Sequence, residues 1–172
     1  MSAYNNDDTY NVIAEHVIEA LQADAKLGTG GTLAIKKWEQ ELRESAGDYN
    51  ENELPAVAVT VDLSTQDEVR QDQDRTVYLA LVMLYTAGGR LITVQKNVKY
   101  FAARIERVMQ QQLYTAKQLA SVTADLADAV SGSVVVDKLT TEIGATAEQG
   151  QMPRGVAALG FAISIDFTVT ED

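Results

Sequence analysis

Hydrophobic residues recur every three or four positions in two stretches of the chain, and this spacing predicts two amphipathic helices. The first stretch runs from Tyr10 to Leu27, behind possible N-cap oxygens at Asp7 to Thr9 and ahead of a glycine-rich stop. The second begins at Leu91 and runs to Val108. The same spacing continues from Leu119 to Val130, but no residue marks where one helical piece ends and the next begins.

Alternation of hydrophobic with small or polar residues predicts the strands of the core. The segment Ala56–Leu63 places three valines and a leucine on one face, and Thr76–Tyr85 is apolar on both faces, as an interior strand is. The segment Val156–Val169 alternates most strictly. We therefore expect an aspartate at Ile163 or at Leu81 to abolish folding, because an unpaired buried charge costs several kcal/mol.

Three other segments carry weaker or different signals. Val134–Val136 predicts a short strand. Thr32–Glu44 fits both a helix and a strand, and we favour a strand that leaves the sheet near Glu41. The polar run Ser64–Asp74 has almost no apolar residues, so it predicts an exposed loop or a long hairpin connection.

The order helix, strands, helix, strands predicts an α+β fold, with helices packed on one face of a mostly antiparallel sheet and an extended loop or hairpin. The chain has 172 residues, of which 46% are hydrophobic and 23% charged. These values fit a single domain over residues 1–172 that buries a core of its own.

Charge and cysteine content narrow the classes of function. The chain has no cysteine, which excludes disulfides, thiolate zinc sites and cysteine nucleophiles. A net charge of -11 disfavours sequence-specific nucleic-acid binding and anionic membranes, because both draw their affinity from Lys and Arg. No apolar run is long enough to span a bilayer and the first residues lack a signal-peptide pattern, so we expect a protein made in the cytoplasm.

No motif in the sequence indicates catalysis, a metal or a cofactor. His16 is the sole histidine and has neither a cysteine nor a second histidine to complete a familiar site. Gly28–Gly31 follows a helix and lacks the Lys-Ser/Thr ending of a phosphate loop, so we interpret it as a helix exit. The carboxylates near the polar run match no calcium-loop spacing. We expect no catalytic, metal or cofactor site, and no enzyme.

Candidate interface residues lie in two places. Trp38, the sole tryptophan, fits a partly buried core position and an interface anchor equally well. The polar run carries both signs of charge, so its side chains are candidates for contact with another subunit, although a mobile, solvated loop is the alternative. The candidates are Trp38, Asp67, Glu68, Arg70, Asp72, Asp74 and Arg75.

The succession of elements resembles the tail terminator (tail completion) proteins of long-tailed bacteriophages. The resemblance covers the N-terminal helix, the strand entered through Leu54–Val59, the polar run, the strand Thr76–Tyr85, the next helix and the closing strand Gly155–Val169. It rests on pattern and order, not on a signature motif. Residues 115–131 form a longer helix-to-strand connection than is usual in that family, and the topology of residues 115–150 stays open.

The resemblance implies a virion assembly protein of the phage tail. In that family the subunits form a ring, usually hexameric, on the finished tail tube, where they stop its polymerisation and present a surface for head joining. The implied partners are other copies of the chain, the tail tube protein and a head-tail connector or head completion protein. The alternatives are another phage neck or tail-tube subunit and, from a different class, a small enzyme or ligand-binding domain.

Overall fold

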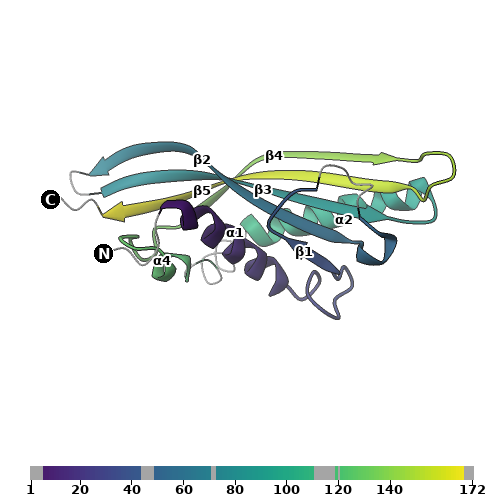
Figure 1. The fold of residues 1–172 in the computed structure, drawn as a ribbon, viewed down its shortest axis with the longest axis horizontal. Coiled ribbons are helices and arrows are strands. Elements are labelled where there is room, and N and C mark those ends of the chain that lie inside the picture. Colours follow the sequence, from purple (N-terminus) through teal and green to yellow (C-terminus); the bar gives the residue numbers. More distant parts are fainter. Residues whose placement is uncertain (1–5, 44–48, 71–72, 111–118, 120, 169–172) are drawn as a thin grey trace.

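A five-stranded sheet with the order β1-β2-β3-β5-β4 is the frame of the computed structural model (Figure 1), which describes residues 6–43, 49–70, 73–110, 119 and 121–168. Among the described strands, only β1 and β2 pair in parallel. The elements are α1 (Asn6–Gln22), β1 (Lys37–Glu39), a 3₁₀ turn (Glu51–Glu53), β2 (Ala56–Arg70), β3 (Gln73–Ala87), α2 (Leu91–Gln110), α4 (Val122–Asp125), β4 (Val135–Thr146) and β5 (Arg154–Thr168). The predicted α+β class with a mostly antiparallel sheet is confirmed.

The three central strands are unusually long. β2, β3 and β5 have 15 residues each, or roughly 50 Å of extended chain, about three times the length of an average strand. They run along the longest axis of the molecule and give it an elongated outline (Figure 1). The sheet therefore extends well beyond the roughly 25 to 30 Å that either long helix can cover.

One face of the sheet forms the main core with both long helices. Alternate residues of β2, namely Val57, Val59 and Val61, are buried there as predicted. α1 packs on β2, whereas α2 packs on β3, β5 and β4. The helix residues with the lowest exposure in this core include Ile13, Val17, Leu21, Val98, Ala102, Ile105 and Met109. Their three-and-four spacing is the reason why the sequence folds into helices at these places.

The opposite face of the sheet is only partly covered. Leu81 of β3 aligns with Thr60 of β2 and Gly160 of β5, and all three are partly buried. Leu79 on the same face is 38% exposed. The expectation that Leu81 is as critical as the fully buried Ile163 is therefore corrected: the residue lies in an interior strand, but on the face without the helices.

A second, smaller cluster covers one end of this open face. Tyr49 and Leu54 approach from the segment that precedes β2, and they pack against Ala58 and Tyr85 of the sheet. Tyr49 is 1% exposed, and its ring centroid lies 4.8 Å from that of Tyr85. Residues 49–54 thus shield part of a surface that the helices leave open.

Several predicted boundaries are wrong for physical reasons. The first helix ends at Gln22 instead of Leu27, because residues 23–31 fold into turns in which the Gly28 amide donates to the Asp24 carbonyl. A side chain at Gly28 would collide with the Gln22 carbonyl, so glycine is required by close packing rather than by flexibility. Of the predicted helical pattern Leu119–Val130, residues 121–130 contain only the one-turn helix α4.

One predicted strand is longer in the structure, and two segments whose assignment was open are now settled. β4 continues to Thr146, far beyond the predicted Val134–Val136, and most of its side chains are exposed. In Thr32–Glu44 the favoured strand is confirmed but short: within residues 32–43 it is the three-residue β1, which ends at Glu39, near the expected exit at Glu41. Of the two alternatives for the polar run Ser64–Asp74, the long hairpin is confirmed, because β2 and β3 remain paired up to Arg70 and Gln73. Strands of polar residues show no hydrophobic alternation in the sequence, because backbone hydrogen bonds to the neighbouring strand, and not burial of side chains, hold them in the sheet.

Candidate functional site

The candidate interface residues of the polar run lie on the hairpin formed by β2 and β3. Asp67 aligns with Arg75, Glu68 aligns with Asp74, and Arg70 aligns with Gln73. β-bulges interrupt the register after Leu63 and after Glu68, which bends the hairpin and increases its twist. The side chains of residues 63–70 are not described, and Asp72 lies outside the described residues. The backbone therefore brings acidic and basic positions together in adjacent strands.

Arg75 has an ionic partner within its own chain. Its Nε donates to Asp166 Oδ1 of β5 at 3.0 Å, while its side chain is 47% exposed. Asp74 is partly buried. An exposed pair of this kind contributes about 0 to 1 kcal/mol to stability. This ion pair thus links the hairpin to β5. A contact between the hairpin and another subunit remains a prediction.

Trp38 lies at the centre of β1, aligned with Val57 of β2. Its side chain is partly buried and packs against the main core. Of the two roles that its sequence environment allowed, the core position is observed, and the exposed part of the ring leaves an interface contact as a prediction.

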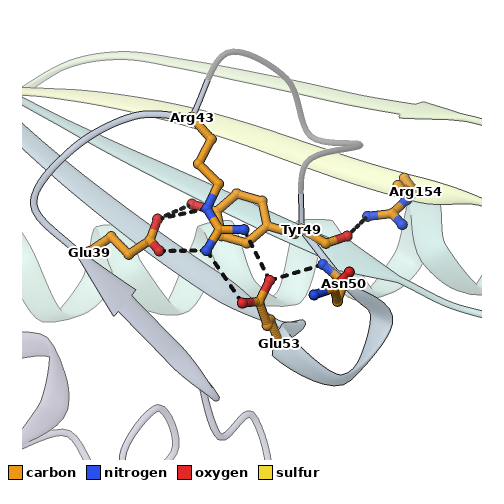
Figure 2. Close-up of polar contacts among 6 residues, drawn as sticks. All are labelled: Glu39, Arg43, Tyr49, Asn50, Glu53 and Arg154. Carbon is orange, nitrogen blue, oxygen red and sulfur yellow. Dashed lines mark hydrogen bonds and ion pairs between the residues drawn. The ribbon is translucent and has the colours of Figure 1, made fainter.

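A polar cluster that the sequence did not indicate begins at Glu39, the residue after Trp38 (Figure 2). We call Glu39, Arg43, Tyr49 and Glu53 the arginine clamp. Arg43 donates from Nη2 to Glu39 Oε1 at 2.7 Å and from Nη1 to Glu53 Oε2 at 3.0 Å, and the Tyr49 hydroxyl donates to Glu39 Oε2 at 2.8 Å. The Arg43 guanidinium also lies 4.0 Å from the Tyr49 ring centroid, which adds a cation–π contact.

The contacts within the clamp shift the pKa values of its members. The hydrogen bond from Arg43 holds the pKa of Glu39 and that of Glu53 below their usual values. Burial, with the hydrogen bond to Glu39, raises the pKa of Tyr49. Both carboxylates are therefore ionised and fully engaged at neutral pH, which suits a structural tie better than proton transfer.

The clamp fixes the segment that covers the end of the open sheet face. Arg154 of β5 donates from Nη1 to the Tyr49 carbonyl at 3.0 Å, and the Asn50 amide donates to Glu53 Oε2 at 2.9 Å (Figure 2). A depression of about 420 Å³ is lined by residues 39–43, including the exposed Leu42. Through Arg43, the clamp connects this depression to the segment that covers the end of the open sheet face.

His16 of α1 connects to two side chains at α4. Its Nε2 lies 2.6 Å from Asp125 Oδ2, and its Nδ1 lies 3.1 Å from the Ser121 Oγ. The imidazole is buried, whereas Ser121 is exposed. A serine, a histidine and a carboxylate are the residue types of a hydrolase triad. Here, however, both partners come from one short turn and bracket the ring, so the arrangement attaches α4 to α1.

A buried ion pair joins the end of α1 to α2. Asp24 is 4% exposed; it accepts hydrogen bonds from Arg104 and from the amides of Lys26 and Leu27. Burial raises the pKa of the Asp24 carboxyl, but Arg104 and the two amides outweigh it and lower that pKa overall. The carboxylate is therefore charged in the folded protein and depends on Arg104 for compensation.

The described residues contain no group of three or more His, Cys, Asp or Glu side chains that could hold a metal ion. Within the same residues, no helix is long and apolar enough to cross a membrane.

Sequence reasoning missed the arginine clamp and the Asp24–Arg104 pair. Glu39 and Arg43 are four residues apart, but that spacing indicates an ion pair only on a helix, and the segment is not helical. Asp24 and Arg104 are 80 residues apart, so only the tertiary fold brings them together. The partners of His16 could not be found from the sequence, because Ser121 and Asp125 lie more than 100 residues away from it.

No protein-family model matches the chain, and no curated protein matches it. Among solved structures, a chain described as "Virion of native gene transfer agent (GTA) particle" is similar to this one with a TM-score of 0.46 and 16% identity. The match covers 95% of this chain and 99% of that chain.

Proposed function

We propose that this chain is a virion assembly protein of the tail terminator kind. Copies of the chain form a ring on the finished tail tube, stop its polymerisation and offer a surface for head joining. The partners are other copies of the chain, the tail tube protein and a head-tail connector or head completion protein.

The open face of the long sheet is the observation that carries this proposal. Leu79, Leu81 and Met83 of β3 lie on that face and are at least partly exposed, beside the small residues Ala158 and Ala162 of β5. A contiguous apolar surface on a sheet indicates contact with another protein. Three strands of 15 residues are also far longer than a core of this size requires, so they extend the surface available to neighbours.

The hairpin of β2 and β3 gives the second support. The resemblance in element order requires an extended polar segment between these strands, and the chain has a paired hairpin there with exposed Arg75 near its end. Each exposed ion pair at a subunit interface contributes little binding free energy. A closed ring repeats the pair at every interface, and the repeated pairs fix the register between subunits.

A capping experiment tests the proposal. Tail tube subunits of the same virus are polymerised with and without the purified chain, and tube lengths and ends are measured by negative-stain electron microscopy. We expect shorter tubes with a ring at one end only. Growth of tubes from the chain itself would favour the alternative of a tube-forming subunit, and unchanged tube lengths with bare ends would contradict the proposal.

A variant with a shortened hairpin tests whether the hairpin tip takes part in tube capping. Residues 68–74 are replaced by Asn-Gly, so that a two-residue turn joins Asp67 directly to Arg75, its aligned partner. The variant keeps the buried part of β2 and the Arg75–Asp166 pair, so we expect a folded monomer that caps tubes less well. Normal capping by this variant would show that the hairpin tip takes no part.

A further inference from the structure

One stripe of α2 faces away from the sheet and combines cations with exposed apolar side chains. At 100° per residue, its exposed members fall within about 100° of one another, opposite the buried stripe. These residues, which we call the basic strip, are Ile92, Lys96, Lys99, Tyr100, Ala103 and Arg107. Ile92 and Tyr100 are 62% and 63% exposed, more than any other large hydrophobic residue in the described part of the chain.

The cations of the basic strip are concentrated and lack partners in the described chain. Five of the 14 Lys and Arg residues fall in residues 88–110, against a single acid, Glu106, whose Oε1 lies 3.0 Å from Lys138 Nζ. Among the residues that the structure describes, Lys96, Lys99 and Arg107 form no ion pair. This local excess of positive charge stands out in a chain with a net charge of -11.

α1 has the opposite character. It contains no Lys or Arg, and its exposed residues include Glu15 and Glu19. Asp125 and Asp128 add two carboxylates from the α4 region, which packs on α1. We call these four residues the acidic strip. Because α1 covers β2 while α2 covers β3, β5 and β4, the two strips belong to different halves of the helical layer.

We propose that the basic strip of one copy docks on the acidic strip of another copy. The inference rests on the proposed function and identifies one surface through which copies meet. Strongly acidic copies repel each other unless a cationic patch orients the encounter, and the basic strip supplies that patch. Ile92 and Tyr100 lie among its cations, where burial against a neighbour removes apolar surface from water.

Charge reversal tests this contact with the full chain. The first variant is Lys96→Glu/Lys99→Glu, the second is Glu15→Lys/Glu19→Lys, and the third combines all four changes. Lys26→Glu/Lys36→Glu is the matched control, since both lysines are exposed, lie outside α2 and change the net charge by the same amount as the first variant. Circular dichroism checks folding, and sedimentation velocity measures assembly at low and at high salt.

We expect the wild-type chain to self-associate at low salt and to dissociate as salt screens the strips. Each double variant should weaken association by at least tenfold relative to the control, and the combined variant should restore it because the strips are then complementary again. A monomeric wild-type chain, equal loss in the control, or no recovery in the combined variant would overturn the inference. Retention of the wild-type chain on double-stranded DNA, abolished by Lys96→Glu/Lys99→Glu, would assign the strip to nucleic acid instead.

The capping experiment separates the two proposals. If the double variants still cap tail tubes as the wild type does, the terminator function stands and the strip contact fails. If the wild type assembles through the strips but never caps tubes, the strip contact stands and the terminator function fails.

Discussion

Replacing Arg104 with methionine should destabilise the fold strongly, because it leaves a buried charge without compensation. Asp24 is 4% exposed and Arg104 is 20% exposed, so the pair is largely removed from water. Loss of one partner of such a pair costs about 3 to 5 kcal/mol. The amides of Lys26 and Leu27 still donate to Asp24, each at 3.1 Å, so we expect the lower end, about 3 kcal/mol. That is a large part of a typical stability of about 5 to 15 kcal/mol.

The loss of stability in Arg104→Met should depend on pH in a defined direction. The folded protein lowers the pKa of Asp24, so the pair contributes stability that is present above the unfolded carboxyl pKa of about 3.9 and is lost as pH falls through the folded value. In Arg104→Met the two amides still lower the pKa of this carboxyl, but the guanidinium no longer offsets its burial, so we expect that pKa to lie above its wild-type value. The deficit of the variant is therefore complete at neutral pH and shrinks as acid protonates Asp24.

Urea unfolding at neutral pH and near pH 4 measures this effect. The double variant Asp24→Asn/Arg104→Met is the control, since the amide oxygen still accepts from the two backbone amides and no charge remains buried. We expect it to lose only about 1 to 2 kcal/mol. An Arg104→Met deficit below about 1 kcal/mol at neutral pH, or one that grows on acidification, would refute the reasoning.

Three further predictions use single side chains. Ile163→Asp should prevent folding because the residue is 1% exposed in the main core. Leu81→Asp, on the open face, should lower the free energy of unfolding by only about 1 to 2 kcal/mol, measured by thermal unfolding. Equal losses of stability in the two variants would show that the open face is covered. Tyr49→Phe should cost about 1 kcal/mol through the lost hydrogen bond to Glu39, and no change in urea unfolding would count against the clamp. His16→Ala should increase proteolysis near α4 without loss of tube capping, and a fluorophosphonate probe should leave Ser121 unlabelled; labelling would indicate an enzyme.

The covered half of the fold could be predicted from the sequence because burial leaves a periodic trace. Val57, Val59 and Val61 alternate, and α2 keeps its three-and-four spacing, because each of these elements has one face in the main core. β4 and the distal part of the hairpin left no such trace. Their strands are held by backbone ladders between polar or exposed residues, and backbone hydrogen bonds have no sequence signature.

Of the candidate site, only the charged positions of the hairpin could be predicted from the sequence. The sequence located the charged hairpin positions, and the structure aligned Asp67 with Arg75 in adjacent strands. The partner of Arg75 in β5, Asp166, came only from the fold because it lies 91 residues away. The clamp around Arg43 was missed for a different reason: Glu39 ends β1 and Glu53 ends the 3₁₀ turn, and no periodic pattern in the sequence brings these two carboxylates to Arg43.

The most direct test of the account is the fate of tail tubes that grow in the presence of this chain. Tube subunits are polymerised with increasing amounts of the wild-type chain, and the ends of each tube are classified by electron microscopy. The account predicts that tubes stop growing once a ring of the chain occupies one end, and that added subunits no longer extend that end. Tubes that continue to grow from both ends at saturating amounts of the chain would contradict it.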